Sequence, residues 1–200
     1  MQQTTWWRYE GFMEQSAMEF LKGQLLVATP QLTDPNFSRT VVLMIEHDEN
    51  GAFGVILNRP SARTVADVWS EMENSPCECL EAINVGGPVM GPILALHSEI
   101  SLSEAEVLPG VYLAAQRDTL DKLVRRAEAE FRLFSGYAGW GEGQLDYELK
   151  QGGWITTVAK DDYIFDLSDD LWRRVGNDIT QNVLRGAMNI KHFPDDPSVN

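Results

Sequence analysis

The chain has 200 residues, 44% of them hydrophobic, which is enough for one domain with a substantial core. Thirty acidic residues against sixteen basic ones give a net charge of −14, which argues against direct binding of nucleic acid. The sequence lacks both an apolar run near the ~20 residues of a membrane-spanning helix and an N-terminal signal pattern, so we expect a cytoplasmic protein without a membrane partner.

The first part of the chain predicts strands. Residues 24–28 form a short apolar segment that ends before Thr29-Pro30, because the residue before proline is pushed out of helix. Residues 40–45 form a continuous apolar run, which is typical of a strand buried on both faces. Asn50-Gly51 favours a tight turn after it, so residues 53–57 are expected to return as the second arm of a hairpin.

The later part mixes helices with strands. Residues 118–131 carry apolar side chains at helical spacing, and the basic side chains of Lys122, Arg125, Arg126 and Arg132 read as its solvated face. Hydrophobic spacing predicts further helices at 64–72 and 144–150, one carrying Leu171, Trp172 and Val175, and a short one at 181–189. Strands are expected at 93–97, 111–114 and 154–159. The predicted class is a single α+β domain.

The most unusual stretch is residues 134–145, where four glycines fall within eight residues among large aromatics. Glycine is needed where φ is positive or where another backbone or a ligand comes close. The pattern predicts a strand, a tight glycine turn and the start of a helix, a geometry that often holds a ligand. Packing of Tyr137 and Trp140 beside crowded backbone is the alternative explanation.

Motifs for known chemistry are missing from this sequence. The glycines do not have the spacing of a phosphate loop or a dinucleotide fingerprint, and no nucleophile elbow surrounds Ser135. Cys77 and Cys79 supply half of a zinc site and are expected to be free thiols. We therefore assign no catalytic residue, metal or cofactor. The alternative is a hydrolase or transferase with His47 or His97 as general base and glycine-turn amides as an oxyanion site.

Three long segments carry a resemblance to a known family. They are GQLLVATPQLTDPNFSRTVVLMIEHDENGAFGVILNRP (23–60), VGGPVMGPILALHS (85–98) and GYAGWGEGQLDYEL (136–149), with further likeness at Trp154 and residues 165–172. The chain resembles the AlgH/YqgE family over about residues 21–179. The resemblance implies a bent, bifurcated mixed sheet that closes into a pseudo-barrel flanked by helices. It also implies a family domain at 19–190, between an N-terminal extension (1–18) and a C-terminal tail (191–200).

The resemblance implies little about activity, since members are labelled as candidate transcriptional regulators without agreed catalytic residues. We expect a non-enzymatic regulatory or binding protein, whose partner is an unidentified protein or small molecule. Arg39 and Arg59 are the arginines within these segments, and arginine suits planar recognition of a carboxylate or phosphate. The predicted ligand-binding residues are Asp34, Asn36, Phe37, Arg39, His47, Asn58, Arg59, Gly86, Gly87, His97, Gly136, Tyr137, Gly139, Trp140, Gly141 and Gln144.

Overall fold

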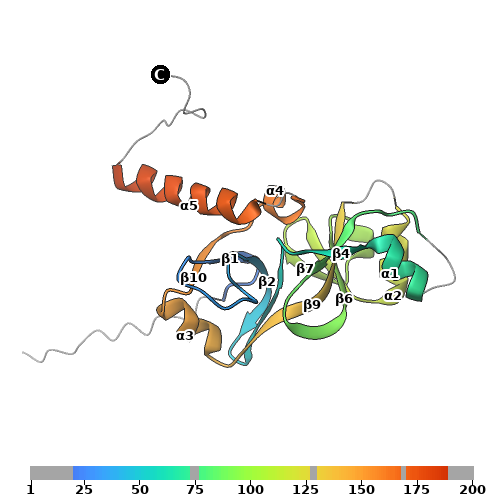
Figure 1. Cartoon of the computed structure of the whole chain (residues 1–200), viewed down its shortest axis with the longest axis horizontal. Coiled ribbons are helices and arrows are strands. Elements are labelled where there is room, and N and C mark those ends of the chain that lie inside the picture. Colours follow the sequence, from blue (N-terminus) through green and yellow to red (C-terminus); the bar gives the residue numbers. More distant parts are fainter. Residues whose placement is uncertain (1–19, 73–76, 127–129, 168–169, 189–200) are drawn as a thin grey trace, which may run out of the picture.

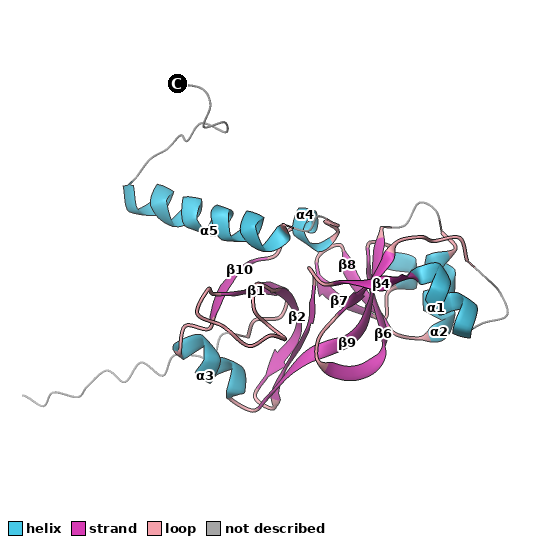
Figure 2. Ribbon diagram, in the orientation of Figure 1, coloured by secondary structure: helices cyan, strands magenta, loops and turns pink. Residues whose placement is uncertain are grey.

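The computed structural model describes residues 20–72, 77–126, 130–167 and 170–188 (Figure 1). Within these residues the chain is a single α+β unit, as predicted, with one curled sheet and helices packed around it (Figure 2). The predicted extension at 1–18 and tail at 191–200 lie outside the described residues. No helix among the described residues combines the length and the apolar composition needed to cross a membrane.

Ten strands form the sheet, in the order β10-β1-β2-β3-β9-β6-β8-β7, and β4 and β5 branch from β9. Their bounds are β1 Gln24–Ala28, β2 Val41–Asp48, β3 Gly51–Ile56, β4 Pro60–Thr64, β5 Ala82–Val85, β6 Val89–His97, β7 Ala105–Leu108, β8 Val111–Ala114, β9 Phe131–Gly141 and β10 Trp154–Val158. The predicted hairpin is confirmed, because β2 and β3 pair antiparallel up to Asp48 opposite Gly51, with Glu49 and Asn50 between the strands.

The long strand β9 makes the sheet fork. One edge of β9 pairs with β6, from Val89 opposite Tyr137 to His97 opposite Phe131. The other edge pairs first with β5 in parallel, near Phe134, and then with β3 in antiparallel fashion, up to Gly141. Two strands therefore share one edge of β9 and must diverge. This geometry confirms the bent, bifurcated sheet that the family resemblance implied.

The helices cover different parts of the curled sheet. Their bounds are α1 Val65–Met72, α2 Arg117–Val124, α3 Gln144–Lys150, α4 Asp161–Ile164 and α5 Leu171–Met188, with a short 3-10 turn at Ile100–Leu102. α1 and α2 share one hydrophobic cluster, α3 packs against a second, and α4 and α5 close the third. Figure 1 shows α4 and α5 on one side of β1 and β10, and α3 on the other.

Strand β2 contributes side chains to two hydrophobic clusters, one on each face of the sheet. Its residues 41–45 are all buried, and they alternate between two clusters. Val41, Leu43 and Ile45 face the cluster under α4 and α5, whereas Val42 and Met44 face the cluster under α3. Since side chains alternate across a strand, an uninterrupted apolar run is what a strand covered on both faces requires.

Two predicted helices differ from the structure. The helix expected at 118–131 ends at Val124, and Phe131 instead begins β9, where its pairing with β6 outweighs the helical spacing. The helices expected around Leu171 and at 181–189 are one continuous helix, α5, that runs to Met188. The end of the second expected helix, Asn189, lies outside the described residues.

Candidate functional site

The loop between β1 and β2 is shaped by residues that were predicted to bind a ligand. Asp34 accepts a hydrogen bond from the Asn36 backbone N–H at 2.7 Å, which closes a local turn. The guanidinium of Arg59 donates to the carbonyl oxygens of Pro35 at 3.0 Å and Ser38 at 3.3 Å. These groups already have partners within the loop. Asp34, Asn36 and Arg59 therefore hold the loop in this structure, and their part in ligand binding stays a prediction.

Asn58 fixes the end of the same loop in an unusual conformation. Its Oδ1 accepts from Val41 N–H at 2.9 Å, and its Nδ2 donates to the Arg39 carbonyl at 2.8 Å. Arg39 has φ of 57°, and among the described residues no other non-glycine residue has a positive φ. L-residues are disfavoured there, because the Cβ approaches the following carbonyl. The surrounding hydrogen bonds thus hold Arg39 in a strained backbone state with its side chain exposed.

A second arginine reaches the same place from the far end of the chain. Arg173 lies in the first turn of α5 and is exposed. That turn is well anchored, because Leu171 is fully buried and Trp172 Nε1 donates to the Ala28 carbonyl at 2.7 Å. Within the described part of the chain, neither Arg39 nor Arg173 makes a hydrogen bond or ion pair through its guanidinium.

These two arginines line one pocket of about 690 Å³. Its walls come from the loop that follows β1, Asn58 and the start of α5, and among the described residues that line it Asp170 is the one carboxylate. Hydroxyl groups of Thr33 and Ser38 also line it. The volume falls within the range of about 300–1,000 Å³ typical of small-molecule sites. Among the described lining residues, two guanidinium groups stand against one carboxylate in an acidic chain.

The glycines of the two predicted turn segments are not among the described residues that line this pocket. Gly136, Gly139 and Gly141 lie inside β9, so the predicted turn begins only after Gly141. A Cβ added to Gly86 would lie 2.3 Å from the Gly136 carbonyl oxygen, and one added to Gly87 would lie 2.2 Å from the Tyr137 carbonyl carbon. No side chain fits such gaps. Gly86, Gly87 and Gly136 let the strands around the fork pack backbone to backbone, whereas a Cβ at Gly139 or Gly141 would meet no backbone so closely. Their part in a ligand site stays a prediction.

The aromatic side chains of this segment are packed as well. The indole N–H groups of Trp140 and Trp154 both donate to Glu148 Oε2, at 3.0 and 2.8 Å. Gln144 Nε2 donates to the other carboxylate oxygen at 3.0 Å, and Gln144 Oε1 accepts from the Gly141 N–H at 3.1 Å. Trp140 and Trp154 are buried. Sequence reasoning missed Glu148 as the shared acceptor of the two indole N–H groups.

Two further aromatic rings of the predicted site pack against neighbours. Phe37 stacks on Trp140 with ring centroids 5.9 Å apart and meets Trp154 edge-on at 5.5 Å. Tyr137 packs edge-on against Phe53, with centroids 5.9 Å apart. This aromatic group therefore packs under the loop that carries Arg39. Its members, Phe37, Trp140 and Trp154, are not among the described residues that line the pocket.

The two histidines considered as general bases lie elsewhere. His47 is buried, and its Nδ1 accepts from the Leu21 backbone N–H at 3.2 Å. His97 is completely buried at the end of β6, where neither ring nitrogen has a hydrogen-bond partner. Burial lowers the pKa of His97 below its usual 6.5, because the charged imidazolium loses solvation. His97 is not among the described residues that line the Arg39 pocket, and its place in a ligand site stays a prediction.

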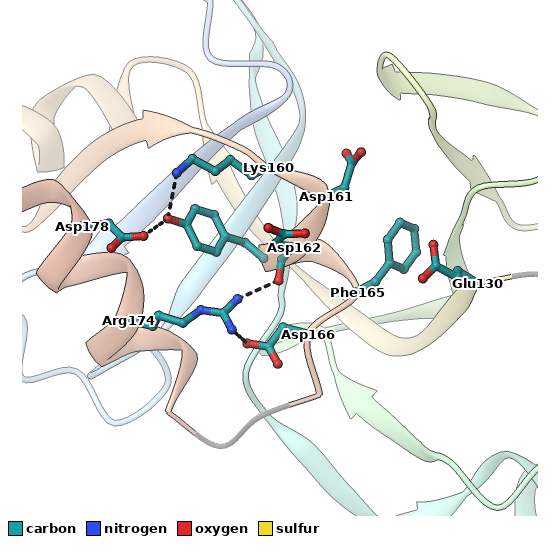
Figure 3. Close-up of a pocket in the computed structure, with 9 residues that line it drawn as sticks. Glu130, Lys160, Asp161, Asp162, Phe165, Asp166, Arg174 and Asp178 are labelled. Carbon is teal, nitrogen blue, oxygen red and sulfur yellow. Dashed lines mark hydrogen bonds and ion pairs between the residues drawn. The ribbon is translucent and has the colours of Figure 1, made fainter. Parts of the chain in front are cut away.

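A second cavity, of about 610 Å³, lies between α4 and α5 (Figure 3). Its cations are already engaged: Arg174 pairs with Asp166 at 2.7 Å and donates to the Asp162 carbonyl at 2.7 Å. Tyr163 donates to Asp178, and burial together with this carboxylate raises the pKa of the phenol. This network connects α4 and the residues after it to α5. In the Arg39 pocket, by contrast, the guanidinium groups of Arg39 and Arg173 have no such partner among the described residues.

Arg132 extends that network into the core and was wrongly predicted as a solvated residue. It lies in β9 with its side chain buried, and it donates to the carbonyls of Ile164 at 2.9 Å and Asp166 at 3.0 Å, and to Asn84 Oδ1 at 2.7 Å. Burial lowers its pKa to about 10. Arg132 thus joins the sheet to the segment that leads into α5, and so helps to fix the position of Arg173.

Comparison with known proteins identifies the family. The family model described as AlgH-like matches residues 25–183, which is most of the chain. The chain belongs to the AlgH-like family. UPF0301 proteins from Streptomyces avermitilis (36% identity over 90% of this chain and 95% of the relative) and Xanthomonas campestris (39% identity over 80% and 91%) are among its relatives.

Solved structures agree with this AlgH-like assignment. The solution structure of the AlgH protein from Pseudomonas aeruginosa matches with a TM-score of 0.69 and 30% identity, covering 91% of this chain and all of that one. An X-ray structure of a Corynebacterium diphtheriae protein matches with a TM-score of 0.65 and 26% identity, covering 78% of this chain and 85% of that one. The fold is therefore that of the AlgH-like family, and the function must be argued from the pocket.

Proposed function

We propose that this AlgH-like chain is a regulatory binding protein whose pocket, lined by Arg39 and Arg173, takes a ligand that carries a carboxylate or phosphate. The observation that carries the proposal is that both arginines are exposed at one pocket of a chain with net charge −14, and neither guanidinium forms an ion pair with a described residue. In a chain with nearly two acidic residues for each basic one, two such guanidinium groups at one pocket favour an external anion.

The strain at Arg39 supports the same proposal. A positive φ at a non-glycine residue is retained only where the surroundings enforce it, and such residues cluster at functional sites. Here Asn58 enforces it through the Arg39 carbonyl. Because glycine would adopt this backbone without strain, the presence of arginine points to a use for its side chain.

The remaining features fit binding better than catalysis. The described residues that line the pocket include no histidine, cysteine or lysine, the side chains that most often serve as general bases or nucleophiles at neutral pH. A hydrolase or transferase based on His47 or His97 is not favoured, since both are buried away from the pocket. Any role in transcription would then act through the bound ligand or a protein partner. The free thiols of Cys77 and Cys79 are consistent with a reducing, cytoplasmic location, which we also propose.

The test is a titration of the full chain with inorganic phosphate, followed by NMR of backbone and arginine side-chain N–H groups at low ionic strength. Arg39→Gln and Arg173→Gln should each weaken binding about tenfold, since a charge-assisted hydrogen bond contributes about 1.5–3 kcal/mol. Arg63→Gln is the matched control, because Arg63 pairs with Glu71 on the surface outside the pocket. Equal phosphate affinity in all three variants would overturn the proposal.

A further inference from the structure

The arginine pocket continues into an apolar groove. A smaller cavity, of about 270 Å³ and separate from the one between α4 and α5, lies between α5 and the strands β1 and β10. Thr29, Pro30, Trp172 and Arg173 line both cavities, so the two hollows meet at the first turn of α5. Figure 1 shows α5 lying along this side of β1 and β10. A ligand held by the arginines therefore has a direct extension into the groove.

The groove exposes apolar surface on an edge of the sheet. Its walls include Val27 of β1, Ile155 of β10, and Trp172 and Ile179 of α5. β10 is a terminal strand of the sheet order, and Ile155 is 44% exposed. Contiguous exposed apolar surface next to fixed polar groups is typical of ligand-binding grooves.

Gly176 gives an independent indication that the groove is kept open. It lies inside α5, where glycine is the least favourable residue after proline. A Cβ at Gly176 would meet nothing within 4 Å, and its φ is not in the positive range. Neither crowding nor backbone conformation therefore requires glycine here, in contrast to Gly86. Gly176 lines the groove, so the missing side chain leaves room for something that is not part of the chain.

We infer that the ligand is a small amphipathic acid, with its anionic head on Arg39 and Arg173 and its aliphatic or aromatic body in the groove over Gly176. The inference rests on the proposed function for the head group and adds the apolar body. Charge complementarity selects the anion, and the contiguous apolar walls select the body.

The experiment compares three probes on the full chain by calorimetry and NMR. Octanoate carries both parts, acetate carries only the head, and 1-octanol carries only the body. Octanoate should bind at least about tenfold more tightly than either of the others, because burial of methylene groups adds to the anion contact. The Trp172 indole N–H and the Gly176 amide should shift with octanoate but not with acetate.

Variants separate this inference from the proposed function. Gly176→Leu fills the groove and should reduce octanoate affinity to that of acetate, leaving acetate binding unchanged. Asn182→Leu, an exposed position of the same helix that lines neither cavity, is the control. Ile155→Thr on β10 should weaken octanoate in the same direction, so the test does not depend on one variant.

Each result has a defined meaning. If acetate binds through the arginines but octanoate binds no more tightly, or if Gly176→Leu leaves octanoate unchanged, the amphipathic ligand is refuted while the anion site stands. If no anion responds to Arg39→Gln or Arg173→Gln, both the function and this inference are refuted. Binding of octanoate-containing vesicles or of apolar-ended peptides, without binding of free octanoate, would also refute a small-molecule ligand.

Discussion

At Arg39, a glycine variant should be more stable than an alanine variant, which is the reverse of the order expected at a loop position with negative φ. Arg39 has φ of 57° and its side chain has no partner in the described structure, so truncation removes no native contact. A left-handed backbone costs about 1–2 kcal/mol for a residue with a Cβ. Glycine removes that strain but loses about 0.5–1 kcal/mol through the greater freedom of the unfolded chain.

We therefore expect Arg39→Gly to be more stable than Arg39→Ala by about 0.5–1 kcal/mol. At a position with negative φ, the alanine variant would be the more stable of the two. Urea unfolding, with the midpoint compared at unchanged slope, measures the difference. Both variants should lose phosphate binding to a similar extent, because each lacks the guanidinium. A glycine variant less stable than the alanine variant would refute the claim that Arg39 is held under strain for its side chain.

Three further predictions concern stability. Glu148→Ala should lower the free energy of unfolding by about 2–5 kcal/mol, because the two buried indole N–H groups lose their acceptor; a loss below about 1 kcal/mol in urea unfolding would show that water replaces the carboxylate. Gly176→Ala should raise stability by about 1 kcal/mol, seen as a higher melting temperature, since nothing crowds the new methyl group. Burial lowers the pKa of His97 below its unfolded value of 6.5, so the unfolded chain binds this proton first and stability should fall, by at most about 1.4 kcal/mol per pH unit, as pH drops below 6.5. His97→Leu should flatten that slope between pH 6.5 and 5.5, and an unchanged slope would mean that the folded protein protonates His97 freely.

Local signals in the sequence predicted much of the fold. The hairpin from Val41 to Ile56 is confirmed because its turn is set by adjacent residues, Asn50 and Gly51. The helix at 144–150 is also confirmed, because its hydrophobic spacing is a local signal. Helical spacing misled at Phe131, where pairing of β9 with β6 decides the conformation. Pairing of strands far apart in the chain leaves no mark on the local sequence.

The site was predicted only in part, because its two arginines come from opposite ends of the domain. Arg39 and Asn58 were predicted to belong together, and the structure joins them through one hydrogen bond. Arg59 satisfies loop carbonyls, which a sequence cannot distinguish from a free guanidinium. Arg173 was missed because a tertiary contact places it beside the loop. That contact includes the hydrogen bond from Trp172 to the Ala28 carbonyl. A glycine needed for a turn and a glycine needed for close packing of two strands look alike in sequence. Gly86 is of the second kind, because a Cβ there would collide with the backbone at Gly136.

A double-mutant cycle on the two arginines tests the central claim most directly. Phosphate affinity would be measured for the full chain, Arg39→Gln, Arg173→Gln and the double variant under one buffer condition. If both guanidinium groups hold the same anion, the double variant should lose less than the sum of the single losses, with a coupling of about 0.5 kcal/mol or more. Strictly additive losses, or none, would contradict a shared anion site.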